Sequence, residues 1–339
     1  MRDINMTVSL AGTKGVPMPL PSARSLSVES NIAVLVPCYN EATTIYNVVK
    51  SFQTALPGAV VYVYDNNSTD NTVDEAERAG AHVLLESRQG KGWVVRRMFA
   101  NVEADYYVLV DGDGTYDPSR APEMVALMAR QNLAMVVGRR IHESASAYRP
   151  GHVLGNKIFT TSIAKLFGTA FTDIFSGYRV FSRAFVKSFP VFSDGFEIET
   201  ELTVHALTLG LPVAEISTSY KERPQGSTSK LNTYRDGIRI LWTIVKLFKN
   251  EKPLQFFSIS GLVFLLTALA LAYPIVVTFL ETGLVPRFPT AILATGVAIC
   301  SLILFGCGLI LDTVTKGRRE TKMLSYLNAP RSLSSRTSS

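Results

Sequence analysis

Cysteine, histidine and tryptophan are scarce in this chain of 339 residues, which holds three, four and two of them respectively. The cysteines are Cys38, Cys300 and Cys307, and the last two lie inside an apolar run. They form no disulfide framework and no Cys/His spacing of the kind that binds zinc. The scarcity therefore favours a cytosolic main domain and argues against a metal centre built on cysteine and histidine.

The first 30 residues lack a long apolar run. They carry Pro17, Pro19 and Pro21 with scattered serine and arginine, which predicts neither a signal peptide nor an anchor but a disordered arm. The chain from Ser325 onward is rich in serine and arginine and also predicts disorder. No internal repeat and no nucleic-acid-binding module is visible, so anionic headgroups and phosphates better explain the net charge of +6.

Two uncharged apolar runs in the last third predict a membrane hairpin. They cover about residues 254–280 and 288–311, and each exceeds the roughly 20 residues that span a bilayer. Basic residues precede the first run and follow the second, so the positive-inside rule places both ends of the chain in the cytoplasm. Before the hairpin, residues 232–252 combine a basic face with apolar positions, which is typical of an interfacial helix on membrane lipids.

Strand and helix patterns alternate from Asn31 to about residue 140. Short apolar runs are separated by segments whose apolar residues recur at helical spacing, and Ser68 or Thr69 is expected to cap the second helix. Alternation of this kind predicts a doubly wound α/β domain. The predicted strands are Ile32–Val36, Val60–Tyr64, His82–Leu85, Tyr106–Val110 and Ala134–Val137.

Polar clusters follow three of these strands and would line one edge of the sheet. After the fourth strand, Asp111 and Asp113 stand one residue apart between glycines, and two such carboxylates can hold Mg²⁺ or Mn²⁺. A solvated Asp-Gly turn is the plainer alternative. An EF-hand loop is a poor one, because Tyr116 occupies its glycine position and a strand precedes it.

Gly90-Lys91-Gly92 opens the third helix. It lacks the spacing of a Walker loop and of a dinucleotide fingerprint, so Lys91 is either a phosphate ligand or an ordinary helix start.

Five separated segments, in order, resemble family 2 glycosyltransferases of the GT-A fold. Two of them are Val-Pro-Cys-Tyr-Asn-Glu, ending at Glu41, and the Asp-Asn-Asn-Ser-Thr-Asp segment from Asp65; the third is the Asp-Gly-Asp-Gly segment. Asp-Ile-Phe-Ser-Gly-Tyr-Arg, ending at Arg179, and the loop around Arg223 are similar to segments of the dolichol-phosphate-mannose-synthase-like branch. The likeness covers about residues 31–240.

The resemblance implies roles for particular residues. Pro37, Tyr39, Glu41 and Asp65 would hold the nucleotide of a nucleotide sugar, while Asp111 and Asp113 would bind the metal and the donor diphosphate. At the position where relatives often have a further metal ligand, this chain has Thr115. At the position of the family's second Asp, directly after Asp65, it has Asn66. Lys91 joins the expected donor site, and Asp113 and Asp173 are the candidate catalytic carboxylates.

The arginines favour a phosphate acceptor. A phosphate monoester is mostly dianionic at neutral pH, so it needs positioning and charge neutralisation more than a strong base. Guanidinium groups suit that task. Asp173 could act as a base or could orient an arginine, and the orienting role is slightly favoured. The residues expected at the acceptor phosphate are Arg139, Ser176, Arg179 and Arg223.

The sequence thus predicts a membrane-anchored, inverting glycosyltransferase that moves one sugar from a nucleotide sugar to polyprenyl phosphate at the cell inner membrane. A UDP-sugar such as UDP-glucose or UDP-galacturonate is favoured over GDP-mannose as donor. Another lipid or polysaccharide acceptor, or a non-catalytic scaffold, are the alternatives, and a homo-oligomer is left open. The expected organisation is an arm (1–30), a GT-A domain (31–231), an interfacial helix (232–252), a hairpin (253–312) and a basic tail (313–339).

Overall fold

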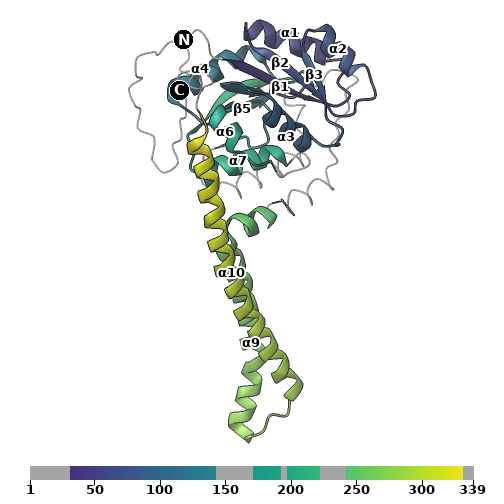
Figure 1. Cartoon of the computed structure of the whole chain (residues 1–339). Helices are drawn as coiled ribbons and strands as arrows, with labels where there is room; N and C mark the ends of the chain where they lie inside the picture. The colour runs from purple at the N-terminus through teal and green to yellow at the C-terminus, as the bar shows by residue number, and fades with distance from the viewer. Residues whose placement is uncertain (1–30, 143–170, 192–196, 222–241, 244, 331–339) are drawn as a thin grey trace. The chain divides into compact units, whose positions relative to one another are not determined.

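Seven strands form one mixed sheet in the order β3-β2-β1-β4-β6-β5-β7 (Figure 1). The computed structural model describes residues 31–142, 171–191, 197–221, 242–243 and 245–330. Within these ranges every strand pair is parallel except the two that β6 makes, with β4 and with β5. The predicted α/β class is confirmed. The strands are β1 (Ile32–Cys38), β2 (Val60–Asp65), β3 (His82–Leu85), β4 (Tyr106–Leu109), β5 (Met135–His142), β6 (Arg179–Ser182) and β7 (Val213–Tyr220).

The sequence patterns missed the antiparallel strand. β6 is only four residues long and follows the Asp-Ile-Phe-Ser-Gly-Tyr segment. No alternation of apolar and polar residues indicates this strand in the sequence. It lies between β4 and β5 in register, with Val180 opposite both Val108 and Val136. Its insertion places the turn before Arg179 against the carboxyl end of β4, which matters for the site.

Helices cover both faces of the sheet, with α1, α2 and α4 on one side and α3, α6 and α7 on the other (Figure 1). The predicted Ser68 or Thr69 cap is wrong, because α2 starts later and Ser68 instead accepts a hydrogen bond from the backbone of Asn40. The helices of the sheet domain are α1 (Ile45–Ala55), α2 (Thr72–Arg78), α3 (Lys91–Asn101), η1 (Pro118–Arg120), α4 (Ala121–Gln131), α6 (Arg183–Ser188) and α7 (Ile198–Thr208).

The central strands are apolar on both faces because helices bury both sides of them. Val34, Leu35 and Val36 are fully buried in succession, which explains why β1 reads as a continuous apolar run. Beneath the sheet, Phe181 and Phe185 stack with ring centroids 5.0 Å apart. This contact packs α6 against β6, which in turn pairs with β4.

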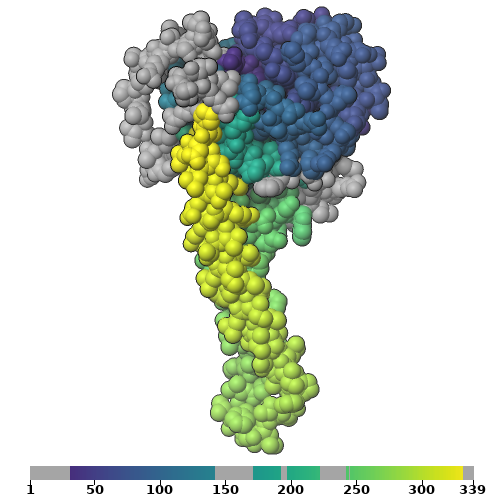
Figure 2. All heavy atoms as spheres, in the orientation of Figure 1, coloured from purple at the N-terminus to yellow at the C-terminus, as the bar shows by residue number. Residues whose placement is uncertain are grey.

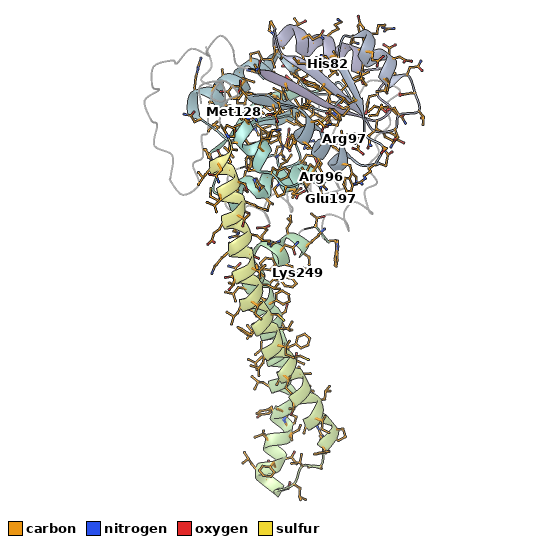
Figure 3. The ribbon with its side chains drawn as sticks, in the orientation of Figure 1. His82, Arg96, Arg97, Met128, Glu197 and Lys249 are labelled. Carbon is orange, nitrogen blue, oxygen red and sulfur yellow. The ribbon has the colours of Figure 1, made fainter. Side chains whose placement is uncertain are left out.

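The second compact unit, residues 241–321, contains most of two long antiparallel helices, α9 (Pro253–Thr282) and α10 (Phe288–Asn328), which lie against each other in Figures 1 and 2. Both are long and apolar enough to cross a membrane. Small residues let them approach, since Ser301 donates to the Gly261 carbonyl at 2.8 Å and a Cβ at Gly308 would lie 3.1 Å from Phe257. The apolar side chains of Figure 3 stand outward along both helices.

The predicted hairpin is therefore present, and its helices run beyond the predicted spans. α10 continues through the residues assigned to the basic tail as far as Asn328. Of the predicted interfacial helix, residues 232–241 and 244 lie outside the described residues, while 245–251 are helical. The arm of residues 1–30 also lies outside them.

Candidate active site

Three polar loops meet at the carboxyl edge of the sheet, as predicted, because β2, β1 and β4 are parallel neighbours. The loops after β1 and β2 are joined by the backbone N–H of Thr69, which donates to Asn40 at 2.8 Å. Thr44 donates to the Gly112 carbonyl at 2.7 Å and so ties the first loop to the third. Pro37, Tyr39 and Glu41 are partly buried along this edge.

Asp65 ends β2 with only 3% of its surface exposed. Its Oδ2 accepts a hydrogen bond from the backbone of Ser68 at 3.0 Å, whereas its Oδ1 is buried with no partner among the described residues. An unsatisfied buried acceptor is costly. Asp65 can therefore receive an N–H donor from a ligand, as the imide or amide group of a nucleotide base would provide.

Asn66, which replaces the second Asp of the expected pattern, is a buried structural link. Its amide donates to the carbonyls of Glu86 and Arg88 at 2.9 and 2.7 Å, and its Oδ1 accepts from Gly90 at 2.7 Å. A carboxylate could not donate the first two bonds. Asn66 thus shapes the turn that precedes Lys91.

Lys91 lies between two carboxylates. Its Nζ is 2.5 Å from Asp111 Oδ1 and 2.5 Å from Glu199 Oε1, the latter on α7. Burial alone would lower the pKa of Lys91, but the two carboxylates outweigh it and raise the pKa above its usual range. The lysine is therefore a permanent cation at this edge.

Asp113 is 3% exposed and accepts hydrogen bonds from the backbone and hydroxyl of Thr115, at 3.1 and 2.6 Å. Thr115 thus orients Asp113. No group of three or more His, Cys, Asp or Glu side chains suited to a metal occurs in the described part of the chain. Asp111 and Asp113 do supply the hard oxygen donors that Mg²⁺ or Mn²⁺ prefers, with diphosphate and water available to complete the coordination.

Gly177 brings the turn before β6 against Asp111. A Cβ at this position would collide with the Asp111 carboxylate, and the Gly177 N–H donates to the Tyr116 hydroxyl at 2.8 Å. Only glycine permits this approach. The turn that carries Asp173 and Ser176 is thereby placed beside the metal-ligand candidates.

Asp173 is paired with Arg140. The guanidinium donates to both carboxylate oxygens at 2.8 and 2.7 Å, and the Arg140 backbone N–H adds a bond of 3.1 Å. Burial would raise the pKa of Asp173, but the arginine outweighs it and the pKa is lowered. Of the two roles considered for Asp173, this geometry matches the one in which it orients an arginine.

The sequence predicts Arg179 at the acceptor phosphate, but in the structure its side chain is fully buried. It donates to the carbonyls of Ser176 and Ile174 at 2.8 and 2.5 Å and to Thr203 at 2.9 Å. Burial lowers its pKa to about 10. With two of its donor atoms bound to carbonyls of the turn, Arg179 shapes that turn, and it presents no surface to an acceptor.

Ser176 is buried too, and its hydroxyl donates to Gly138 at 2.6 Å. Arg139 is half-buried and donates to Ser217 at 2.7 Å. Arg223 lies outside the described residues. Sequence reasoning assigned no chemistry to Glu199, since Glu197, Glu199 and Glu201 all suit a helix start, and Figure 3 labels the first of them at the N-cap of α7.

Comparison with known proteins agrees with this geometry. The glycosyl transferase family 2 model matches residues 33–189. Glycosyltransferase AglJ of Haloferax volcanii is 36% identical over 261 residues, which is 75% of this chain and 82% of that protein. The chain is a family 2 glycosyltransferase.

Two further comparisons bear on this glycosyltransferase. A dolichyl-phosphate hexose transferase of H. volcanii is 26% identical over 222 residues, or 66% of this chain and 96% of the relative. The crystal structure of Mycobacterium tuberculosis glucosyl-3-phosphoglycerate synthase with Mn²⁺, UDP and glucosyl-3-phosphoglycerate aligns with a TM-score of 0.54 at 23% identity, covering 65% of this chain and 79% of that one. The second likeness shows a shared fold.

Proposed function

We propose that this glycosyltransferase moves one sugar from a nucleotide sugar to polyprenyl phosphate, with inversion at the anomeric carbon. The observation that supports the proposal is that the carboxylates of Asp111 and Asp113 and the oriented guanidinium of Arg140 belong to loops and strands at one edge of the sheet. Asp111 contacts the Gly177 turn, and the same turn holds Asp173 against Arg140. Asp111, proposed for the donor, and Arg140, proposed for the acceptor, are therefore both contacted by the turn that contains Asp173 and Gly177.

The donor half is suited to a nucleoside diphosphate sugar. The unpartnered Oδ1 of Asp65 would accept from the base, for which uracil is favoured, and Pro37, Tyr39 and Glu41 would line the nucleotide. Asp111 and Asp113 would hold Mg²⁺ or Mn²⁺, which when bound would neutralise the diphosphate as it departs. Lys91 lies within reach of the same position.

The acceptor half needs a cation rather than a strong base, because the phosphate monoester is already nucleophilic. A phosphate oxygen forms the new bond to the anomeric carbon while the bond to the donor diphosphate breaks. We assign the acceptor phosphate to Arg140, supported by Arg139 and by Arg223, the latter outside the described residues. Arg179 and Ser176 act indirectly, by shaping the turn.

A lipid acceptor fits the second unit of the chain. The two long apolar helices suggest a membrane anchor, and the named activity of the H. volcanii hexose transferase supports a polyprenyl phosphate. We place the protein in the cell inner membrane, with the sheet domain and both termini in the cytoplasm.

The test is a screen of the purified full-length protein with UDP- and GDP-sugars against three lipids: polyprenyl phosphate, the free polyprenol and diacylglycerol. We expect a sugar-phosphate lipid, detected by mass spectrometry, from the first alone. EDTA should abolish its formation, and Asp113→Ala should reduce the rate at least ~100-fold. Equal transfer to diacylglycerol would contradict a phosphate acceptor and favour a neutral lipid. Full activity in EDTA would contradict the proposed metal requirement.

A further inference from the structure

Lys91 is shared between a carboxylate of the donor site and one outside it. Asp111 belongs to the proposed metal pair, whereas Glu199 comes from α7, 108 residues further along the chain. The side chains of Lys91, Asp111 and Glu199 are 10%, 29% and 7% exposed. Lys91 therefore pairs with both carboxylates, and Glu199 also interacts with the buried guanidinium of Arg179. Of the two carboxylates, that of Asp111, the metal-ligand candidate, is the more exposed.

A divalent cation and Lys91 compete for Asp111. The ammonium already occupies Oδ1 at 2.5 Å, and Oδ2 is packed against Gly177. A metal ion and an ammonium on the same carboxylate would repel each other strongly in a partly buried site. The lysine must therefore withdraw from Asp111, at least in part, when metal arrives.

Glu199 is the carboxylate with which Lys91 can remain paired when it leaves Asp111. Its carboxylate is almost fully buried and lies 2.5 Å from Lys91 Nζ. A buried ammonium that lost Asp111 without a second carboxylate would be left unpaired, which is costly. With Glu199 present, the lysine stays neutralised while it turns from Asp111.

We propose that Lys91 is an exchangeable counter-ion of the donor site and that Glu199 is the residue that makes the exchange possible. This inference rests on the proposed function. Before the donor arrives Lys91 neutralises Asp111. With a divalent cation held by Asp111, Lys91 would stay paired with Glu199 and would turn to the diphosphate of the nucleotide. Glu199 is thus a positioning residue that acts through Lys91.

The exchange predicts opposite effects for two substitutions. Lys91→Met removes the competitor, so the nucleotide-free protein should bind Mn²⁺ about fivefold or more tightly than wild type. Glu199→Gln removes the alternative partner, so Lys91 should hold Asp111 harder and Mn²⁺ should bind about fivefold or more weakly. Lys91→Met should nevertheless weaken UDP or GDP binding in the presence of Mn²⁺, while UMP or GMP binding changes little.

The experiment is an Mn²⁺ titration of the full-length protein in detergent, followed by electron paramagnetic resonance of the free ion. Lys50→Met and Glu77→Gln make the same charge changes at exposed positions of α1 and α2, and should leave Mn²⁺ binding unchanged. In the double variant Lys91→Met/Glu199→Gln, the affinity should stay within about twofold of that of Lys91→Met, because in the proposed exchange Glu199 affects the metal through the lysine.

The outcomes separate this inference from the proposed function. Mn²⁺ binding that does not depend on Asp111 and Asp113 would overturn the proposed metal site itself. Binding that does depend on them, but that Glu199→Gln leaves unchanged or weakens equally with and without Lys91, would overturn the exchange alone. If Lys91→Met fails to fold, the Glu199→Gln titration can still overturn the exchange, because an affinity that is not weaker there contradicts it.

Discussion

Arg140 and Asp173 show how a short ion pair can prepare a site. The carboxylate engages Nε and Nη2 of the guanidinium, and the Tyr220 ring lies 5.4 Å from its central carbon. Its orientation is therefore set before an acceptor arrives. The remaining donors of a guanidinium held in this way can meet a phosphate without further ordering of the side chain.

We expect Arg140→Ala to reduce kcat/KM for polyprenyl phosphate by roughly 10- to 150-fold, which corresponds to the loss of a charge-assisted contact worth ~1.5–3 kcal/mol. Arg140→Lys should recover part of the activity, because the charge remains while the two-pronged geometry is lost. Steady-state kinetics measure both. Affinity for the nucleotide should change little, and Arg120→Ala on the exposed surface should match wild type. If the Arg140→Ala enzyme keeps wild-type activity, the assignment of the acceptor phosphate to Arg140 is wrong.

His205 makes the sheet domain sensitive to acid. It is 3% exposed, lies against Phe185 and Phe189, and neither ring nitrogen has a hydrogen-bond partner among the described residues. Burial lowers its pKa to about 3. Since the unfolded imidazole takes up a proton below about pH 6.5 and the folded one resists it, the unfolded state gains relative stability as pH falls through this window.

The free energy of unfolding should therefore decline by up to about 1.4 kcal/mol per pH unit between pH 6.5 and pH 3 because of this residue. Thermal melts of wild type and His205→Leu at pH 7.5 and pH 5 measure the effect. The wild-type midpoint should drop more than that of the variant. His82→Leu, at an exposed position on β3, serves as the control. Equal drops in wild type and His205→Leu would contradict the assignment.

At the scale of elements, the β3–α3 turn is fixed from the end of another strand. Asn66 at the end of β2 donates to two carbonyls of the turn and accepts one N–H from it. The position of this turn determines where α3 begins and therefore where Lys91 lies. A single amide therefore couples the second polar loop to the position of Lys91.

Asn66→Asp should destabilise the domain by about 1–3 kcal/mol, because a buried carboxylate would face two carbonyl oxygens that lose their donors. It should also weaken nucleoside diphosphate binding by displacing Lys91. Denaturant unfolding and calorimetric titration test the two effects. The neighbouring Asn67→Asp makes the same change at an exposed position whose amide donates to Ser87, and it should have a smaller effect on both. Equal effects of the two substitutions would show that the buried network is unimportant.

At the scale of the whole molecule, the chain combines a soluble α/β architecture with a helical hairpin. The link between α9 and α10 is short, so the two helices must run in opposite directions. If both cross the bilayer, the segments before and after the hairpin lie on the same side. That arrangement would keep the sheet domain on the side that supplies nucleotide sugars.

Single cysteines introduced into a variant without the three native ones should report this topology. In intact spheroplasts, Leu284→Cys in the link between α9 and α10 should react with a membrane-impermeant maleimide, because this exposed position would lie on the far side of the membrane. Glu320→Cys, at an exposed position beyond the apolar part of α10, serves as the opposite probe and should react only after the membrane is opened. Reaction of both positions from outside would mean that one helix does not span the bilayer.

The sequence by itself determined the features that depend on local pattern. Apolar runs of strand length alternating with helical stripes require a layered α/β domain, and two long uncharged runs require an apolar environment. Asp111 and Asp113 could be found for the same reason, because a strand end and two glycines mark the place. Each of these inferences needs only residues close together in the chain.

Only the tertiary structure decided which arginine is buried, which one pairs with Asp173, and which carboxylates contact the lysine. Arg140 and Arg179 are equally basic in sequence, but the insertion of β6 buries the second and leaves Asp173 to orient the first. Glu199 could not be told from its neighbours, since its partner Lys91 is 108 residues away. Charge and hydrogen-bonding capacity are local properties of a sequence, whereas burial and pairing arise from contacts between distant segments.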